Sequence, residues 1–161
     1  QQAFGLSQSL GIPFGEAKEM IERYFAAYPG VRSYLDATIE EAKAKGYAET
    51  MFGRKRHIPE LKASNAATRG FGERTAMNHP MQGTAADIIK IAMARVSRRL
   101  EEEGFAAHMI LQVHDELLIE TWKEEEEEVR EILKEGMMHA ADLSVPLEID
   151  MHSGKNWYEA K

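Results

Sequence analysis

The sequence predicts an α+β fold with an antiparallel sheet and packed helices, and three features of the residue pattern support this class. Apolar residues recur at helical spacing near both ends and through the middle of the chain. Two pairs of β-rich runs are each joined by a short turn, which is typical of hairpins. Helices and strands do not alternate strictly, so a parallel sheet with crossover helices is disfavoured.

The helices of the N-terminal end follow from apolar spacing and from end signals. The first runs from Phe14 to Tyr28, where Tyr28-Pro29-Gly30 breaks it. The second runs from Val31 to Ala42 and ends at Gly46, a residue suited to the left-handed position that follows a helix.

Further helices are expected in the middle and near the C-terminal end. Residues 65–78 should be helical, and Pro80 should stop this helix because proline cannot donate a backbone hydrogen bond. A separate helix over 84–103 carries one apolar stripe, and Thr84 and Asp87 have the spacing of a capping box at its start. A last helix covers 129–137.

The expected strands come mostly as hairpins. Tyr47–Phe52 and Arg54–Ile58 flank Gly53, which suits a turn. Residues 107–113 and 116–121 meet at His114-Asp115-Glu116. Val145–Met151 is expected to be a last strand.

The composition of the 161 residues, 43% hydrophobic and 29% charged, is that of one globular domain. The absence of cysteine excludes a disulfide scaffold and a thiolate zinc site, and no apolar run is long enough for a membrane span. The net charge of −7 is unevenly distributed, because residues 43–99 carry twelve basic against four acidic residues and residues 100–135 are strongly acidic. Since charges act over about 10 Å at moderate salt, the basic middle could bind a polyanion.

The most informative stretch is His114-Asp115-Glu116, which places a histidine and two carboxylates between two apolar strands. An ionised carboxylate inside a sheet is costly unless it is paired or bound to metal, whereas at a hairpin tip it can face an open cleft. Carboxylate oxygens suit Mg²⁺ or Mn²⁺, with Asp115 as the direct ligand and Glu116 acting nearby. The alternative is an ordinary tight turn that contains an aspartate.

Two further groups of residues are candidates for nucleic-acid binding. Arg74 and Asn78 are four apart on one helix face, and Gln82 follows Pro80. Asparagine and glutamine amides can donate to the N3 and O2 acceptors that recur in the DNA minor groove whatever the base pair. The basic arm Gly53–His57 either clamps phosphates or simply keeps the surface soluble, and the pattern alone does not choose between them.

Taken together, these segments resemble the C-terminal part of family A DNA polymerases, the bacterial DNA polymerase I group, over essentially the whole chain. Residues 74–87 match the family pattern R-x-x-x-N-x-P-x-Q-G-T/S-A-A-D, and Gln112-Val113-His114-Asp115-Glu116 matches its motif C. Residues 3–6 resemble the stretch after the nucleotide-binding fingers helix, and residues 47–59 resemble the palm hairpin. Residues 145–147 and 154–158 resemble the closing segment.

The resemblance implies a template-directed DNA polymerase that uses two metal ions to add a deoxynucleotide (dNTP) to a primer 3′-hydroxyl. Asp115 would be the metal carboxylate for Mg²⁺, with Mn²⁺ as the substitute, and Glu116 its auxiliary acid. His114 would approach the primer terminus. Primer–template contacts would come from Arg74, Asn78 and Gln82, with Arg54 and Arg56 as backbone contacts. Residues 1–46 would be a helical fingers segment and residues 47–161 a palm segment.

Family A catalysis also needs the aspartate of motif A and the triphosphate-binding helix of motif B, and neither motif occurs in this sequence. We therefore expect a fragment or split subunit of a larger right-hand polymerase fold, cut near Gln1 and with its natural C-terminus. It should be inactive without an N-terminal portion that carries motifs A and B. A cytoplasmic, nucleoid-associated protein without membrane contact is expected.

The rival hypothesis is a non-catalytic DNA-binding or assembly piece whose carboxylates bind no metal by themselves. Metal titration of the chain, with and without the N-terminal portion, separates the two hypotheses. A small metal-dependent hydrolase would need a further cluster of carboxylates or histidines, and the sequence offers none.

Overall fold

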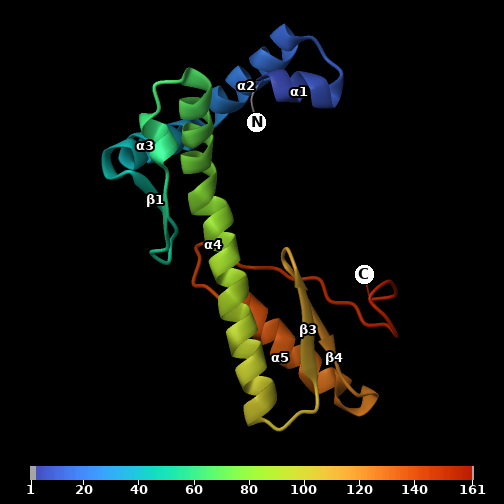
Figure 1. The fold of residues 1–161 in the computed structure, drawn as a ribbon. Helices are drawn as coiled ribbons and strands as arrows, with labels where there is room; N and C mark the ends of the chain where they lie inside the picture. Colours follow the sequence, from blue (N-terminus) through green and yellow to red (C-terminus); the bar gives the residue numbers. More distant parts are fainter. Residues whose placement is uncertain (1–2, 161) are drawn as a thin grey trace. The chain divides into compact units, whose positions relative to one another are not determined.

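The computed structural model describes residues 3–160, so the expectation about the chain start at Gln1 lies outside the described residues. The chain divides into two compact units. The first comprises the residues up to Glu49 together with Gly53–Pro80, and the second comprises Thr50–Phe52 together with the residues from Met81 onward. Both units combine helices with a two-stranded antiparallel sheet (Figure 1), which confirms the predicted α+β class.

The first unit begins with three helices, α1 (Ala3–Leu10), α2 (Phe14–Ala27) and α3 (Pro29–Lys45). The break between α2 and α3 is confirmed and is only one residue long. Pro29 can occupy the first position of α3, because the backbone N–H that proline lacks would have no hydrogen-bond partner within the helix at that position. Gly46 ends α3 as predicted. Its φ is +80°, and its N–H donates to the Ala42 carbonyl oxygen at 2.7 Å. The short helix α1 was not predicted.

The first hairpin is confirmed but is shorter than expected. Strands β1 (Tyr47–Glu49) and β2 (Lys55–His57) pair antiparallel, with Tyr47 opposite His57. A single 3₁₀ turn, η1 (Pro59–Lys62), follows. The core of this unit consists of small and aliphatic side chains, namely Ala42, Ala48, Ile58, Leu61 and Ala76.

The helix α4 (Ala66–Glu102) corrects the predicted stop at Pro80, since residues 65–78 and 84–103 do not form two helices. Figure 1 shows it as one uninterrupted ribbon. An interior proline costs a helix about 3 kcal/mol because a backbone hydrogen bond is lost and the ring crowds the preceding turn. Burial of Ala76 before Pro80 and of Ala92 and Val96 after it favours a helical backbone on both sides and outweighs this cost.

The second unit packs α4 residues against a hairpin and a helix. Strands β3 (His108–Val113) and β4 (Glu116–Glu120) pair antiparallel as predicted, and after the 3₁₀ turn η2 (Lys123–Glu125) the helix α5 (Glu126–Met138) confirms the last expected helix. The buried core consists of Val96, Leu100, Ala107, Val129 and Ile132. Gly136 lets α5 approach α4 so closely that an added Cβ would lie 2.4 Å from Val96 Cγ2.

The expected last strand is wrong, because residues 145–151 have no regular secondary structure. A β-strand needs a neighbouring strand to pair its backbone groups, and the periodicity of a segment cannot supply one. The Met151 carbonyl oxygen instead accepts a hydrogen bond from Arg130 Nη2 at 3.5 Å. Within residues 3–160, no helix has the length and apolar character to cross a membrane.

Candidate active site

The turn between β3 and β4 carries the predicted carboxylates at an exposed tip. Val113 pairs with Glu116, so His114 and Asp115 form the two-residue connection. His114 has φ +51°, an uncommon left-handed conformation for a residue other than glycine. Gln112 Nε2 donates to the His114 carbonyl oxygen at 2.6 Å and fixes the turn. His114, Asp115 and Glu116 are all exposed, so the tip can meet a ligand.

The donor chemistry at this tip fits a hard divalent cation, although only in part. Asp115 and Glu116 offer adjacent carboxylates, and carboxylate oxygens are the ligands that Mg²⁺ and Mn²⁺ prefer. Across residues 3–160, no group of three or more histidine or acidic side chains lies close enough to hold a metal ion. Two carboxylates could make at most part of the ligand set of Mg²⁺, an ion that usually keeps several waters and binds substrate phosphates as well.

The polar residues of α4 form an exposed row. Arg74, Asn78 and Gln82 are spaced by four, and all three are exposed. Because α4 does not stop at Pro80, Gln82 continues the row one turn beyond Asn78 instead of opening a new helix. The structure thus puts the three predicted DNA contacts on one side of a single helix.

Thr84 and Asp87 correct the capping-box interpretation, because both lie inside α4 and neither caps a helix. The Asp87 carboxylate accepts a hydrogen bond from Thr50 Oγ1 at 2.7 Å. Thr84 Oγ1 accepts one from the Met51 N–H at 3.0 Å. The two residues bind the loop between β1 and β2.

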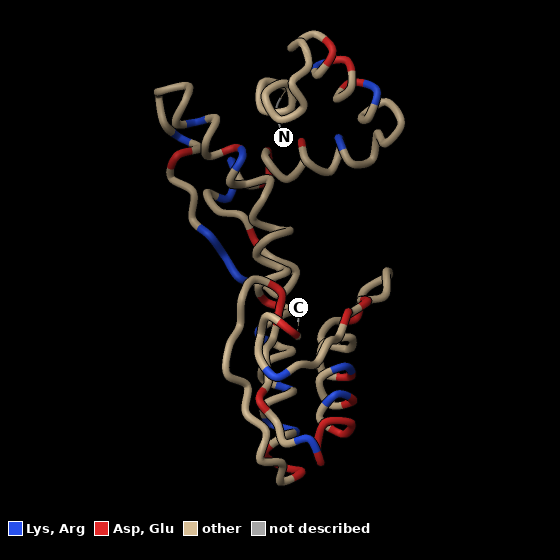
Figure 2. The backbone as a smooth tube through the Cα atoms, turned by 90° about the vertical axis from the view of Figure 1, so that its right-hand side faces the viewer, with Lys and Arg blue, Asp and Glu red and all other residues tan. Residues whose placement is uncertain are grey.

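The basic arm of the first hairpin is exposed along its length. Arg54, Lys55 and Arg56 form a continuous blue stretch of the backbone in Figure 2. Lys55 Nζ lies 4.9 Å from the centre of the Tyr47 ring on the opposite strand. A ring nitrogen of His79 in α4 lies 3.4 Å from the Arg54 carbonyl oxygen. These contacts hold the arm while its charged groups stay near solvent.

Some of the basic residues in the segment 43–99 form hydrogen bonds and ion pairs with acidic residues of the same chain. Lys43 Nζ lies 3.0 Å from Glu73 on α4 and 3.0 Å from Glu40, and these hydrogen bonds, the one to Glu73 foremost, raise the pKa of Lys43 above its usual value. Glu41 raises the pKa of Lys45 in the same way, and Glu103 and Glu135 raise that of Arg99. These three side chains are therefore poor candidates for holding DNA phosphates.

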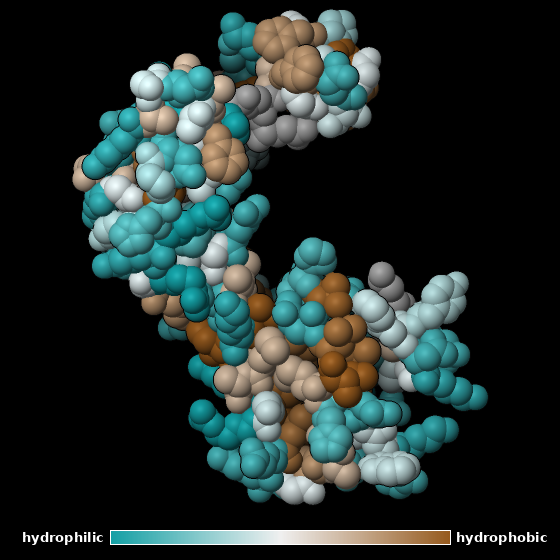
Figure 3. Space-filling model, viewed as in Figure 1, coloured by the Kyte–Doolittle hydropathy of each residue, from teal (hydrophilic) through white to brown (hydrophobic). Residues whose placement is uncertain are grey.

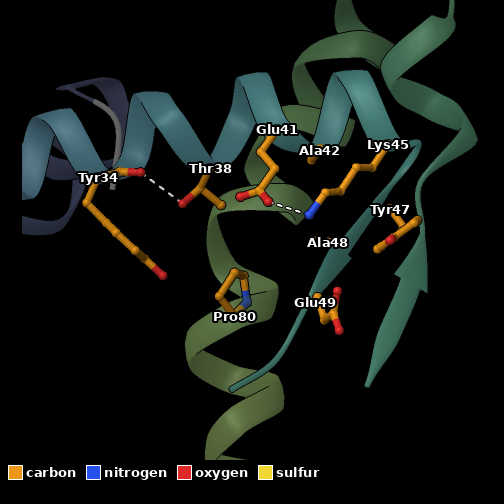
Figure 4. Close-up of a pocket in the computed structure, with 9 residues that line it drawn as sticks. All are labelled: Tyr34, Thr38, Glu41, Ala42, Lys45, Tyr47, Ala48, Glu49 and Pro80. Atoms are coloured by element: carbon orange, nitrogen blue, oxygen red, sulfur yellow. Dashed lines mark hydrogen bonds and ion pairs between the residues drawn. The ribbon is translucent and has the colours of Figure 1, made fainter. Parts of the chain in front are cut away.

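A shallow cavity of about 130 Å³ lies in the first unit, lined by residues of α3 and β1 and by Pro80 (Figure 4). Glu41 and Lys45 form an ion pair at its wall, so their charges cancel. None of the predicted site residues lines this cavity. The candidate site is therefore the exposed hairpin tip and helix row rather than a closed pocket.

The second hairpin also exposes apolar side chains. Ile110 is 53% exposed and Leu111 is 41% exposed, both on β3. On the face of the second unit seen in Figure 3, apolar surface gathers over the β3–β4 hairpin. Apolar surface beside the carboxylate tip is typical of a strand face that meets another protein segment.

Comparison with solved structures shows that the chain has the fold of part of a polymerase domain. The chain is similar to the POL domain of Pol1 from M. smegmatis, solved in complex with DNA primer-template and dNTP. The TM-score is 0.94 at 43% sequence identity, and the match covers 99% of this chain and 28% of that one.

A model of DNA polymerase family A matches residues 1–159, so the chain belongs to DNA polymerase family A, as the motifs predicted. It is 51% identical over 158 residues to DNA polymerase I of Geobacillus stearothermophilus and 49% identical to that of Bacillus subtilis. It is 47% identical to the thermostable DNA polymerase I of Thermus filiformis. The match covers 98% of this chain and 18% of each of the first two relatives, and 99% and 19% in the third.

The roles of the individual site residues stay predictions, because these matches concern whole chains. The structure adds two residues that sequence reasoning missed. Thr50 binds Asp87, and its partner lies 37 positions away, so no periodicity signals the contact. Gln112 fixes the turn at His114, and its position two residues before that turn was the only available signal.

Proposed function

We propose that this chain is the C-terminal part of a template-directed DNA polymerase that transfers a nucleotide from dNTP to a primer 3′-hydroxyl. In this reaction the 3′-oxygen forms a bond to the α-phosphorus, pyrophosphate leaves and the hydroxyl proton is lost. Asp115 carries the proposal, because it presents a carboxylate at an exposed, fixed turn in a chain of this family. A polymerase that acts on DNA in this way would be associated with the nucleoid in the cytoplasm.

Asp115 would be the direct ligand of a divalent ion, Mg²⁺ or Mn²⁺, and Glu116 the auxiliary acid. When bound, two such ions activate the attacking hydroxyl and stabilise charge on the transferred and leaving phosphates. The role of this chain would be to hold negative charge at the tip and to keep the turn in one conformation. Gln112 contributes to this through its hydrogen bond to His114.

The exposed row on α4 would bind the primer–template duplex near the growing end. Arg74, Asn78 and Gln82 offer side-chain donors one helical turn apart, which suits the acceptors of the minor groove that are common to all base pairs. His114 would lie near the primer terminus. Arg54 and Arg56 would contact backbone phosphates, which position DNA without reading its sequence.

The complete site would need a partner segment, an N-terminal polymerase portion carrying motifs A and B. The chain spans 18% of the length of its curated relatives, and its tip supplies only part of a metal ligand set across the described residues. The exposed Ile110 and Leu111 offer an apolar face that such a segment could cover. In this proposal residues 1–46 would be the fingers segment and residues 47–161 the palm segment.

The test is primer extension by the complete protein carrying Asp115→Asn. The amide keeps the shape of the side chain and removes the charge, so extension should fall by about 10²–10³-fold or more while DNA binding stays close to wild type. Glu116→Gln is the matched control and should do less harm, because Glu116 is proposed as the auxiliary acid and not as the direct ligand. Extension at a normal rate by the Asp115 variant would refute the assignment.

The alternative function is a non-catalytic DNA-binding or assembly piece. It is favoured by the scarcity of metal ligands, since residues 3–160 contain no group of three or more acidic or histidine side chains that could hold a metal ion. Titration with Mn²⁺ separates the two functions. Tight Mn²⁺ binding that needs both Asp115 and the N-terminal portion supports the polymerase, and binding of DNA without any Asp115-dependent metal supports the alternative.

A further inference from the structure

Three large apolar side chains are exposed on the second compact unit, where the loop Thr50–Phe52 meets α4. Met51 is 66% exposed, Phe52 is 44% exposed and Met81 is 63% exposed. The Met51 N–H donates to Thr84 Oγ1 at 3.0 Å, and Thr84 lies one helical turn beyond Met81. The three exposed residues therefore lie on neighbouring parts of one surface, and we refer to them together as the Met–Phe patch.

Hydrogen bonds hold the loop that carries two of these residues. Thr50 Oγ1 donates to Asp87 Oδ2 at 2.7 Å and accepts from the Phe52 N–H at 3.3 Å. Thr50 and Asp87 are both buried, and a hydrogen bond to a carboxylate is stronger than one between neutral groups. Exposed apolar surface on a fixed loop is typical of a binding site, because contact with a ligand removes it from water at little entropic cost.

The Met–Phe patch borders the proposed DNA contact at Gln82. Gln82 follows Met81 in α4 and lies about 100° further around the helix, and both side chains are exposed. The minor groove that Gln82 would enter is only about 6 Å wide, and the sugars of the two strands form its walls. A side chain beside Gln82 would therefore meet a sugar.

The chemistry of the Met–Phe patch indicates which part of a duplex it fits. Residues 50–52 and 81–86 include no acidic and no basic residue. Without carboxylates this surface does not repel a polyanion, and without lysine or arginine it does not attract phosphates. Methionine side chains are flexible and adapt to irregular apolar surfaces. The CH groups of deoxyribose, which lie between the phosphates and the base edges, match this chemistry.

We propose that the Met–Phe patch contacts the sugars of the primer–template duplex beside Gln82 and selects deoxyribose over ribose. A ribose 2′-hydroxyl pressed against the patch would lose its hydrogen bonds to water and gain none, which is unfavourable. The 2′-hydroxyl is also the group by which proteins distinguish RNA from DNA. This inference rests on the proposed function, because it takes Gln82 as a minor-groove contact.

The test compares the affinity of the complete protein for primer–templates of one sequence. One duplex is all DNA, and two others carry ribonucleotides near the primer 3′ end, either in the primer strand or in the template strand. The sugar selectivity is the Kd for a ribose-containing duplex divided by the Kd for the DNA duplex, and in wild type it should be above unity for at least one of the two.

Two variants offer the 2′-hydroxyl a hydrogen-bond partner. Met51→Gln and Met81→Gln each place an amide in the patch, so each should lower the sugar selectivity by about fivefold or more. Met81→Leu keeps the surface apolar and should keep the wild-type selectivity. Because Met51 and Met81 are exposed, these variants should unfold at the wild-type Tm. Wild-type selectivity in both glutamine variants would overturn the inference.

Met20→Gln is the matched control for the substitution itself. Met20 is 39% exposed on α2 and is not part of the Met–Phe patch. The control should keep the wild-type sugar selectivity. A fall in selectivity equal to that of the patch variants would show that the effect does not come from the patch, and it would also overturn the inference.

Gln82→Ala distinguishes failure of this inference from failure of the proposed function. If Gln82→Ala weakens binding of the DNA duplex while the patch variants keep the wild-type selectivity, the minor-groove contact stands and the sugar contact is wrong. If Gln82→Ala leaves binding of the DNA duplex unchanged, the minor-groove contact itself is wrong, and the inference fails with it. A lower Tm in Met81→Gln with unchanged selectivity would show that another segment of the complete protein covers the patch.

Discussion

His114 holds the hairpin tip in a conformation that few residue types accept easily. Its φ of +51° lies in the left-handed region, where a β-branched side chain crowds the backbone and costs about 1–2 kcal/mol. Histidine is among the residues enriched there, and glycine pays no steric cost. The geometry of Asp115 therefore depends on its neighbour as well as on its own side chain.

We expect His114→Gly to leave the β3–β4 hairpin as stable as in wild type, whereas His114→Val should destabilise it by about 1–2 kcal/mol. Hydrogen exchange of the β3 and β4 amides measures the difference. The contrast between the two variants isolates the backbone effect, since both remove the imidazole ring. Equal exchange rates would contradict a strained turn at this position.

The α4 row gives a prediction about DNA recognition. Arg74→Ala should weaken primer–template binding by about tenfold or more and Gln82→Ala by several-fold, because a lost hydrogen bond from a charged group costs about 1.5–3 kcal/mol and a neutral one less. The losses should be the same on templates of different sequence, since minor-groove acceptors recur in all base pairs. Lys43→Ala is a suitable control, because Lys43 is paired with Glu73. Losses confined to particular sequences would argue against this contact mode.

At the scale of elements, the approach of α5 to α4 depends on Gly136. An added Cβ would lie 2.4 Å from Val96 Cγ2, and Val96 is fully buried and cannot move aside freely. Gly136→Ala should therefore cost about 1–3 kcal/mol despite the better helix propensity of alanine. Thermal unfolding, with hydrogen exchange of α5 to localise the effect, measures this cost.

Gly15→Ala is the matched control for that prediction. Gly15 lies in α2, and an added Cβ meets nothing within 4 Å. Stability should stay the same or rise slightly, because alanine loses less backbone entropy on folding than glycine. An equal loss of stability in both variants would contradict the prediction, because it would mean that replacing a helical glycine by alanine is destabilising whether or not the added Cβ meets a neighbour.

For the whole molecule, the prediction concerns what the 161 residues do alone. The described residues contain no group of three or more acidic or histidine side chains that could hold a metal ion, and β3 exposes Ile110 and Leu111. Mg²⁺ dehydrates reluctantly and binds weakly to so few ligands, and exposed apolar surface favours self-association. We expect the isolated chain to be inactive in extension of a labelled primer and prone to associate.

Mixing the isolated chain with a chain that bears motifs A and B should restore both solubility and primer extension. Chelation of Mg²⁺ should abolish the restored activity while leaving DNA binding through the α4 row. The matched control is the Asp115→Asn chain, which should restore solubility only. Synthesis by the wild-type chain without any partner, lost in the Asp115→Asn version, would contradict the prediction.

Local chemistry determined much of this protein from sequence alone. The α2–α3 break at Pro29, the end of α3 at Gly46 and the two hairpins follow from residues within a few positions of each other. The exposed carboxylate tip follows in the same way, because a charged residue between two apolar strands is expected in the exposed turn that joins them, as Asp115 is. Family motifs with fixed spacing gave the relationship that the comparisons confirm.

Tertiary contacts decided the rest, because their partners are distant in sequence. Pro80 predicts a helix end, but buried residues on either side keep α4 continuous. Thr84 and Asp87 have the spacing of a cap, but hydrogen bonds to a loop more than 30 positions away give them another task. Residues 145–151 have the residue pattern of a strand but do not form one. A strand forms only where a neighbouring strand pairs with its backbone.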